Sequence, residues 1–248
     1  MKADFARSAR PHLFLIALLS ALIPSACARG HAPVSGPPAD AQSVGPQGVV
    51  LREAPRAPDV RAKHLFYLHG KIIEDKGIRP EDPRYGIYEY EQILDTFKRL
   101  GFTVISEPRP KDTDVNQYAS RTAAQIQELL KAGVPPRLIT VVGASKGSVI
   151  AMLTSTLLRN RDVNFVLMSN CNDWVATNFK IDLYGNVLSI YDVNDEFGQT
   201  CRKLFDQSTG LNRHKEVELK IGTGHAILYK PLKEWVDLVA EWAAEAAG

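Results

Sequence analysis

The stretch LITVVGASKGSVIAMLTSTLL, residues 138–158, decides the fold. It starts with the continuous apolar run Leu138–Val142, passes through the Gly-rich segment Gly143–Gly147, and continues as the longer apolar segment Ser148–Leu158. A short apolar run bounded by glycine is typical of a buried strand, whereas the second segment has the length of a helix. The sequence therefore predicts a strand, a sharp turn and a helix in succession.

The same alternation of strand and helix extends on both sides of this stretch. Continuous apolar strands indicate burial on both faces, as in a parallel sheet covered by helices. We therefore expect an α/β fold, with a doubly wound, mostly parallel sheet of about six strands, helices on both faces and no cap domain. The other predicted strands are His64–Leu68, Phe102–Ser106, Asn164–Met168, Val187–Tyr191 and Val217–Ile221, and the other predicted helices are Tyr88–Leu100, Val115–Ala132 and Lys233–Ala247.

The N-terminal region has the features of an export signal. Positive residues precede the apolar run Leu13–Ile23, which is too short to span a bilayer comfortably. Ala26-Cys27-Ala28 fits cleavage by an ordinary signal peptidase, whereas Ser25-Ala26-Cys27 resembles a bacterial lipobox that would put a lipid on Cys27, although Pro24 departs from that pattern. We expect a periplasmic or secreted protein, or a membrane-anchored lipoprotein. Residues 1–28 are the predicted signal, 29–59 a flexible Pro/Gly/Ala-rich tether, and 60–248 the folded domain.

Composition excludes some partners. The chain has 248 residues, with 30 Lys and Arg against 28 Asp and Glu, giving a net charge of only +2. No basic stripe with interleaved aromatic residues is present, so we expect no nucleic-acid partner. The sequence suggests no metal site and no cofactor. Two cysteines lie beyond the signal, Cys171 and Cys201, and each follows a predicted strand. In an oxidising compartment they are either a disulfide or two unrelated small buried residues.

The segment Gly143-Ala144-Ser145-Lys146-Gly147 is the main candidate for chemistry. A sharp strand-to-helix turn brings backbone segments close together, which explains its flanking glycines, and exposes a serine at the carboxyl end of the sheet. Serine needs a base to act as a nucleophile. His225 follows the last predicted strand in a Gly-rich loop, and is the best-placed base. The acid that orients this histidine should follow the strand Val187–Tyr191, where Asp192 and Asp195 both qualify.

An oxyanion hole needs two backbone N–H donors near the serine. One is expected from Lys146. The other is expected from Lys71 or Ile72, in the loop after the first predicted strand of the domain. We expect His69 and Gly70 to brace that loop rather than to act in catalysis.

Gly70, Ser145, Asp195 and His225, in this order and on these elements, resemble the α/β-hydrolase family over roughly Lys63 to Ala247. The stretch from Leu68-His69-Gly70-Lys71 through the glycine-rich turn also resembles a group of bacterial exported hydrolase-like proteins of unknown substrate. The family order is serine, acid, histidine. Many of these hydrolases have L-x-I-x-G-x-x-D at the acid, which favours Asp195 and puts Asp192 at the glycine position.

The resemblance implies a serine hydrolase that cleaves a small-molecule carboxylic ester through an acyl-enzyme, with activity rising as His225 loses its proton. Alternatives are a thioesterase, peptidase or lactonase with the same triad, and a non-catalytic envelope binding protein. With no cap, we expect an open site, for which the loop Lys71–Gly86 is the main candidate lid. A cationic rim that attracts an anionic ester is a further hypothesis, from Arg79, Arg84, Tyr85, Arg109 and Lys111 together with Lys146.

Overall fold

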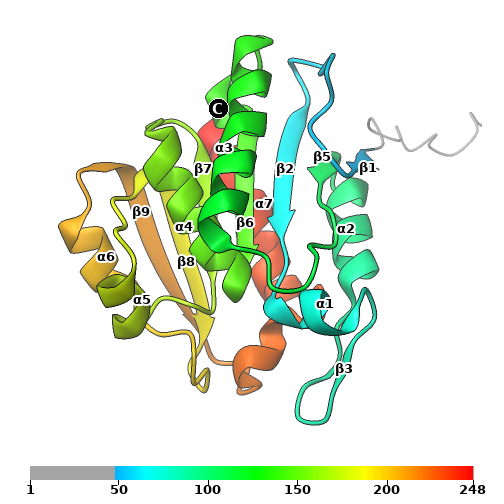
Figure 1. The fold of residues 1–248 in the computed structure, drawn as a ribbon, viewed down its shortest axis with the longest axis vertical. Coiled ribbons are helices and arrows are strands. Elements are labelled where there is room, and N and C mark those ends of the chain that lie inside the picture. The colour runs from blue at the N-terminus through cyan, green and yellow to red at the C-terminus, as the bar shows by residue number, and fades with distance from the viewer. Residues whose placement is uncertain (1–47, 248) are drawn as a thin grey trace, which may run out of the picture. The chain divides into compact units, whose positions relative to one another are not determined.

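The computed structural model describes residues 48–247, which contain a seven-stranded parallel sheet (Figure 1). The strand order is β1-β5-β2-β6-β7-β8-β9. The predicted α/β class and mostly parallel sheet are confirmed. The strands are β1 (Val49–Leu51), β2 (Lys63–Leu68), β5 (Phe102–Ile105), β6 (Ile139–Ala144), β7 (Asn164–Met168), β8 (Tyr184–Asp192) and β9 (Gly210–Leu219).

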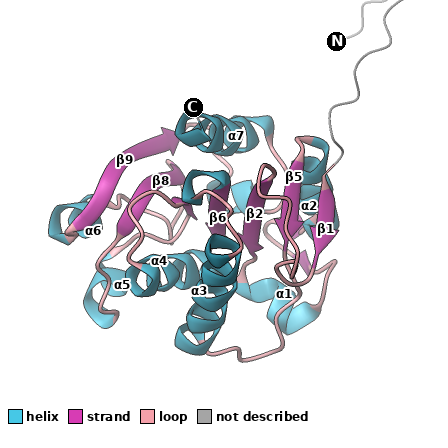
Figure 2. Ribbon diagram, turned by 90° about the horizontal axis from the view of Figure 1, so that it is seen from above, coloured by secondary structure: helices cyan, strands magenta, loops and turns pink. Residues whose placement is uncertain are grey.

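Helices cover both faces of this sheet (Figure 2). One face packs against α3 (Val115–Lys131) and α4 (Lys146–Leu158), and the other packs against α2 (Tyr90–Arg99) and α7 (Lys233–Ala247). Neighbouring residues of one strand supply the two cores, because side chains alternate across a strand. In β2, Phe66 packs on the α3–α4 side and Tyr67 on the α2–α7 side. All seven strands run in the same direction, so their carboxyl ends share the lower edge in Figure 1.

The folded part of the chain begins earlier than residue 60. Residues 49–51, expected in the tether, form the edge strand β1, which pairs in parallel with β5 from Val49 opposite Thr103 to Leu51 opposite Ile105. Three residues are too few to produce a recognisable pattern, and Val49 remains 45% exposed. The predicted signal, the Cys27 lipid site and residues 29–47 of the tether lie outside the described residues. No helix within residues 48–247 is long and apolar enough to cross a membrane.

Two other segments differ from expectation. The expected loop Lys71–Gly86 contains the helix α1 (Lys71–Lys76) and a small antiparallel ribbon, β3 (Glu81–Asp82) and β4 (Gly86–Ile87). Strand β9 starts at Gly210, whereas the sequence pattern predicted a start at Val217. The pattern missed the first part because β9 is an edge strand, whose exposed positions are polar and interrupt the apolar run. Between β7 and β8, residues 169–183 contain only the short helix α5 (Asp173–Asn178), so no cap domain is inserted there.

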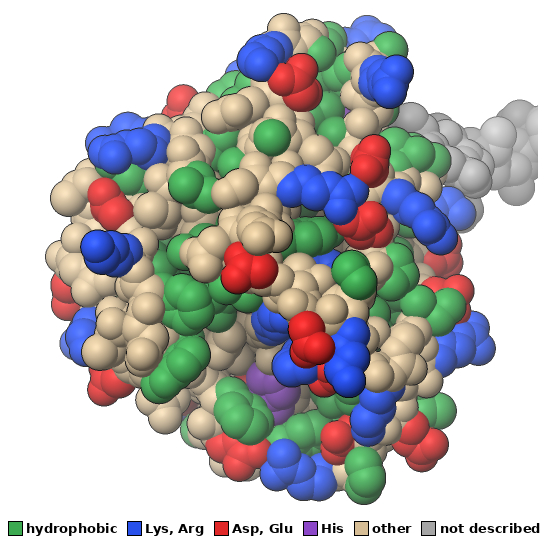
Figure 3. All heavy atoms as spheres, in the orientation of Figure 1, with side chains coloured by type: hydrophobic (Ala, Val, Ile, Leu, Met, Phe, Trp, Pro, Cys, Tyr) green, Lys and Arg blue, Asp and Glu red, His purple; other side chains and the backbone are tan. Residues whose placement is uncertain are grey.

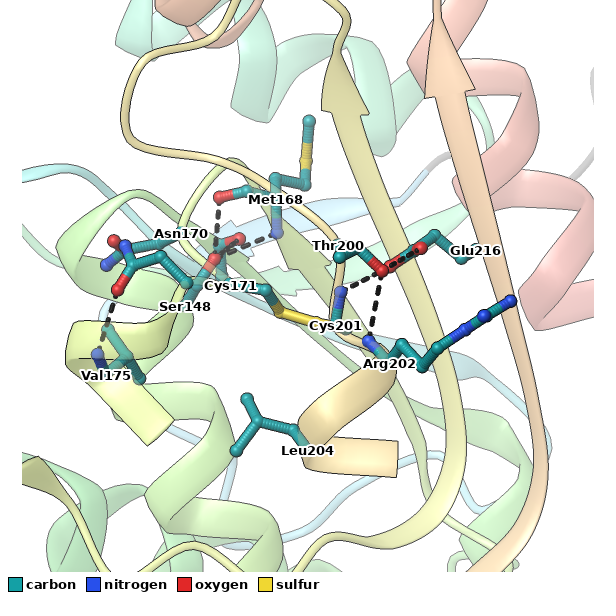
Figure 4. Close-up of a disulfide and its surroundings, with 12 residues drawn as sticks. Ser148, Met168, Asn170, Cys171, Val175, Thr200, Cys201, Arg202, Leu204 and Glu216 are labelled. Carbon is teal, nitrogen blue, oxygen red and sulfur yellow. Dashed lines mark hydrogen bonds between the residues drawn. A yellow bond between two sulfur atoms is a disulfide. The ribbon is translucent and has the colours of Figure 1, made fainter. Parts of the chain in front are cut away.

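Cys171 and Cys201 form a disulfide, with their Cα atoms 5.0 Å apart (Figure 4). Cys171 follows β7, and Cys201 directly precedes α6 (Arg202–Gln207). Both are buried in the core on the α3–α4 side, at 2% and 1% exposure. The backbone N–H of Gln199 donates to the Cys171 carbonyl at 2.7 Å. The bond therefore ties the loop after β8 to the end of β7.

Removing this disulfide is expected to destabilise the fold. It closes a segment with a sequence separation of 30. Losing that constraint on the unfolded chain costs about 3–4 kcal/mol. The double variant Cys171→Ala/Cys201→Ala should show this decrease in the free energy of unfolding, measured by urea titration against the oxidised wild type. A decrease below about 1 kcal/mol would contradict a stabilising role for the bond.

Candidate active site

Ser145 sits at the turn between β6 and α4, with φ 53° and ψ −119°. Few residues other than glycine adopt a positive φ, so the turn holds this serine in a strained conformation. Both flanking glycines are required by close backbone contact. A Cβ on Gly143 would collide with the Gly147 carbonyl, and one on Gly147 would collide with the Leu68 carbonyl. The Ser148 hydroxyl stabilises the turn, because it lies 2.7 Å from the Gly143 carbonyl and 2.7 Å from the Met168 carbonyl and can donate to either. Its contact with Met168 is drawn in Figure 4.

Three predicted residues meet at the carboxyl edge of the sheet. His225 lies on the short 3₁₀ helix η2 (Gly224–Leu228), and its Nε2 lies 3.0 Å from Ser145 Oγ. Its Nδ1 lies 3.1 Å from both carboxylate oxygens of Asp195. Nδ1–H therefore donates to Asp195, which leaves Nε2 to accept the serine proton. The three side chains form one continuous chain of hydrogen bonds.

Asp195 is held as a carboxylate. Burial opposes its ionisation, but the hydrogen bond and charge of His225, with the Gly198 N–H, outweigh burial and lower its pKa. The Gly198 N–H donates to Asp195 Oδ1 at 3.0 Å and the Phe197 N–H at 2.9 Å. The side chain has no exposed area. A buried carboxylate so placed can orient His225 and stabilise its cation.

Asp192, the alternative acid, makes different contacts. Its Oδ2 accepts the backbone N–H groups of Ile221 at 3.0 Å and Gly222 at 2.9 Å. Its Oδ1 accepts those of Gly224 at 2.9 Å and Asn194 at 3.1 Å. Three of these four bonds tie the end of β8, just before Asp195, to the loop that carries His225. The structure places Asp195, and not Asp192, against the imidazole.

The loop after β2 lies against the nucleophile turn. A Cβ on Gly70 would lie 3.5 Å from Ser145 Cβ. Lys71 and Ile72 open α1 directly after this glycine, and Lys146 opens α4 directly after the serine. The first N–H groups of a helix have no acceptor within it. The backbone donors predicted for an oxyanion therefore lie at two helix starts beside Ser145.

His69 is fully buried and braces this loop. The Arg109 N–H donates to its Nε2 at 2.8 Å, so the ring proton is on Nδ1, which donates to the Gly70 carbonyl at 2.8 Å. Burial and the nearby Arg109 charge lower the pKa of His69 to about 3. The ring is therefore neutral at pH 7 and is not positioned as a base.

His69 makes stability depend on pH. As pH falls below 6.5, this histidine binds a proton in the unfolded chain, whereas in the folded protein its pKa of about 3 keeps it neutral. The unfolded state then binds more protons, so folding stability falls as pH falls. Between pH 7 and pH 5 this contributes a loss of about 2 kcal/mol. Urea unfolding of His69→Gln at both pH values should show a loss smaller by that amount, and an equal loss in variant and wild type would contradict this assignment.

Comparison with known proteins addresses the fold. No protein-family model matches the chain. No curated protein matches it either. Among solved structures, an esterase/lipase from an uncultured bacterium is similar with a TM-score of 0.50 and 13% sequence identity, over 79% of this chain and 78% of that one.

The chain has the α/β-hydrolase fold. SOBER1 of Arabidopsis thaliana matches over 75% of this chain and 99% of its own, at a TM-score of 0.49 and 13% identity. A chain from Xanthomonas campestris assigned to the alpha/beta hydrolase superfamily matches over 75% of this chain and 98% of its own, at a TM-score of 0.43 and 15% identity. In this fold, Ser145 occupies the strand-to-helix turn that follows β6.

The predicted cationic rim around the site is not assembled. The Arg109 side chain has no exposed area and pairs with Glu74, so its assignment to a surface rim is wrong. Lys146 pairs with the same carboxylate. The exposed arginines are also paired, Arg79 with Glu91 and Arg84 with Glu196, while Lys111 is exposed on the loop after β5. The sequence could not show these pairings, because each partner is distant along the chain or belongs to another element.

Two aromatic rings lie near the imidazole of His225. The Phe197 ring centroid lies 5.0 Å from that of His225, and the Tyr85 centroid lies 6.1 Å from it. The Tyr85 hydroxyl donates to Glu196 at 3.0 Å, so the β3–β4 ribbon reaches the loop after β8. Phe197 is 46% exposed. Apolar side chains are interspersed with charged ones on the face seen in Figure 3. Sequence reasoning named Tyr85 but missed Phe197, although it follows Asp195 by only two positions.

Proposed function

We propose that this chain is a serine hydrolase that cleaves carboxylic esters through an acyl-enzyme. The observation that carries the proposal is the chain of hydrogen bonds from Ser145 Oγ to His225 Nε2, at 3.0 Å, and from His225 Nδ1 to Asp195, at 3.1 Å. Nucleophile, base and orienting acid are within hydrogen-bond reach of one another, as this chemistry needs.

In the proposed reaction, Ser145 Oγ attacks the ester carbonyl carbon while its proton passes to His225 Nε2. Asp195 stabilises the resulting imidazolium. The negative oxygen of the tetrahedral intermediate accepts hydrogen bonds from the backbone N–H of Lys146 and from that of Lys71 or Ile72. His225 then gives the proton to the departing alkoxide, which leaves as an alcohol. Water repeats the sequence on the acyl-enzyme, and releases the carboxylic acid and free Ser145.

The surroundings of His225 favour an uncharged ester. Each arginine predicted for the rim is paired with a carboxylate, which weakens the attraction for an anionic substrate. Tyr85 and Phe197 instead offer aromatic surface near His225, the group that protonates the departing alkoxide. Such surface contacts apolar groups favourably.

We also propose that the protein is exported, either freely or anchored by a lipid on Cys27. The Cys171–Cys201 disulfide supports this, because such bonds persist in oxidising compartments outside the cytosol. The test of this proposal measures the mass of the protein after maturation in a bacterial host, for wild type and for Cys27→Ala.

A panel of esters tests the proposed activity. The purified protein should hydrolyse neutral 4-nitrophenyl esters of short acids, with thioester and anilide analogues turned over more slowly. A carboxylated ester of equal size should have a kcat/KM no higher than its neutral counterpart, at low and at moderate salt. The proposal would be contradicted if every neutral ester released 4-nitrophenol no faster with the protein than in buffer alone.

A further inference from the structure

A buried cluster of charged side chains lies beside the nucleophile turn, and neither the triad nor the reaction steps above use its charges. Glu74 accepts the Arg109 Nε–H on Oε1 at 2.8 Å and the Lys146 ammonium on Oε2 at 2.6 Å. The Glu74 and Arg109 side chains have no exposed area, and that of Lys146 is 18% exposed. Lys146 also donates to the Thr113 carbonyl at 2.7 Å.

This cluster joins the two segments expected to hold the oxyanion. Glu74 is on α1, three residues after Lys71, and Lys146 is the first residue of α4, next to the nucleophile. Arg109, on the loop that passes α1 in Figure 1, adds a bond from its guanidinium to the His69 carbonyl and one from its backbone N–H to the His69 ring. A single carboxylate thus ties α1 to α4 and to the loop after β5.

Burying these three charged side chains costs free energy that a purely structural role does not explain. Two cations share one carboxylate, so the cluster carries a net positive charge in a water-poor site. Burying ion pairs often gains no stability over well-packed apolar residues. A positive charge fixed behind an oxyanion site is, however, favourable where negative charge develops during a reaction.

We propose that Glu74 is a positioning residue of the oxyanion site, an inference that rests on the proposed function. Through its ion pair with Lys146, it sets the separation between the N–H groups at the start of α1 and the N–H group of Lys146. It also holds the Lys146 and Arg109 cations near the developing oxyanion. Glu74 acts through these groups and touches no reacting atom.

This role has a particular kinetic signature. An oxyanion is present in the transition state and absent from the bound ester, so loosening the oxyanion site lowers kcat and leaves KM nearly unchanged. Binding of a trifluoromethyl ketone, whose adduct with serine carries the same oxygen anion, should weaken in parallel with kcat. A change that merely reduces the folded fraction lowers the number of active sites and leaves kcat per active site intact.

The test compares Glu74→Gln with wild type, with kcat expressed per site titrated by a fluorophosphonate. Glu74→Gln keeps the size of the side chain and removes its charge. We expect kcat to fall by about tenfold to a hundredfold, below the cost of deleting an oxyanion donor, with KM changed less than about threefold. Inhibition by the trifluoromethyl ketone should weaken by the same factor as kcat. The matched control is Asp75→Asn on the same helix, whose partly exposed carboxylate pairs with the Lys71 ammonium.

The outcomes separate this inference from the proposed function. If wild type hydrolyses esters and Glu74→Gln keeps kcat per site within about twofold, or Asp75→Asn loses as much, the positioning role is overturned and the hydrolase survives. If wild type hydrolyses no ester, the proposed function itself fails. If Glu74→Gln shows no cooperative unfolding transition, Lys146→Met decides, because it keeps the backbone N–H and removes the ammonium: an unchanged kcat per site overturns the inference, and a decrease at constant KM supports it.

Discussion

Ser145→Ala is expected to lower kcat on a neutral 4-nitrophenyl ester by about 10⁵- to 10⁶-fold. The variant lacks the only oxygen within hydrogen-bond distance of His225 Nε2 that the described residues place there, at 3.0 Å. The substitution changes the packing little, since it removes only the hydroxyl of a small side chain. Initial rates at saturating ester, together with the thermal unfolding midpoint, measure the effect on activity separately from stability.

A matched serine elsewhere provides the control for this variant. Ser120 lies exposed on α3, where its hydroxyl donates to the Asn116 carbonyl at 2.9 Å. Ser120→Ala should keep kcat within about twofold, as for an ordinary surface substitution. Retention of more than about one hundredth of wild-type kcat by Ser145→Ala would contradict the assignment of the nucleophile.

The second large effect distinguishes the two aspartates. Asp195→Asn is expected to lower kcat by about 10⁴-fold, because the amide cannot hold His225 in the required tautomer or stabilise its cation. Asp192→Asn should act mainly on stability, because it places an NH₂ group against backbone N–H groups that now donate to a carboxylate. We expect it to lower the free energy of unfolding by about 2–3 kcal/mol. Its kcat per folded molecule should stay within about tenfold of wild type.

Kinetics and urea unfolding on the two variants check this division. Equal losses of kcat per folded molecule would contradict it, as would a larger loss in Asp192→Asn. The comparison is matched, since both substitutions replace a buried carboxylate by its amide within three positions, at the end of β8 and just after it.

Much of the fold follows from local sequence. The strand, turn and helix at residues 138–158 are recognisable because the strand is apolar throughout and glycines stand where backbones touch. The long helices are recognisable for a similar reason, since Ile93 and Phe97, or Ile126 and Leu129, recur at helical spacing. Edge strands have no such signal. β1 is too short, and the residues of β9 after Gly210 are only half-buried or exposed.

The site was predictable where chain order carries the information. Ser145, Asp195 and His225 each follow a strand of one parallel sheet, so their proximity follows from topology. The roles of charged residues depend instead on contacts between elements. Arg109 reads as a surface cation until it is seen buried against Glu74, which lies 35 positions away. Asp192 and Asp195 are told apart only by their contacts with a distant loop: Asp192 accepts backbone N–H groups from it, and Asp195 contacts the His225 imidazole.

Reaction with a fluorophosphonate, followed by intact-mass analysis, tests the central claim most directly. This reagent forms a bond to a serine oxygen that an adjacent base has activated, and needs no knowledge of the substrate. The account predicts that wild type gains the mass of one phosphonyl group, and that Ser145→Ala gains none under the same conditions. A wild type that stays unlabelled, or a Ser145→Ala variant that labels as fast as wild type, would contradict the claim that Ser145 is the nucleophile.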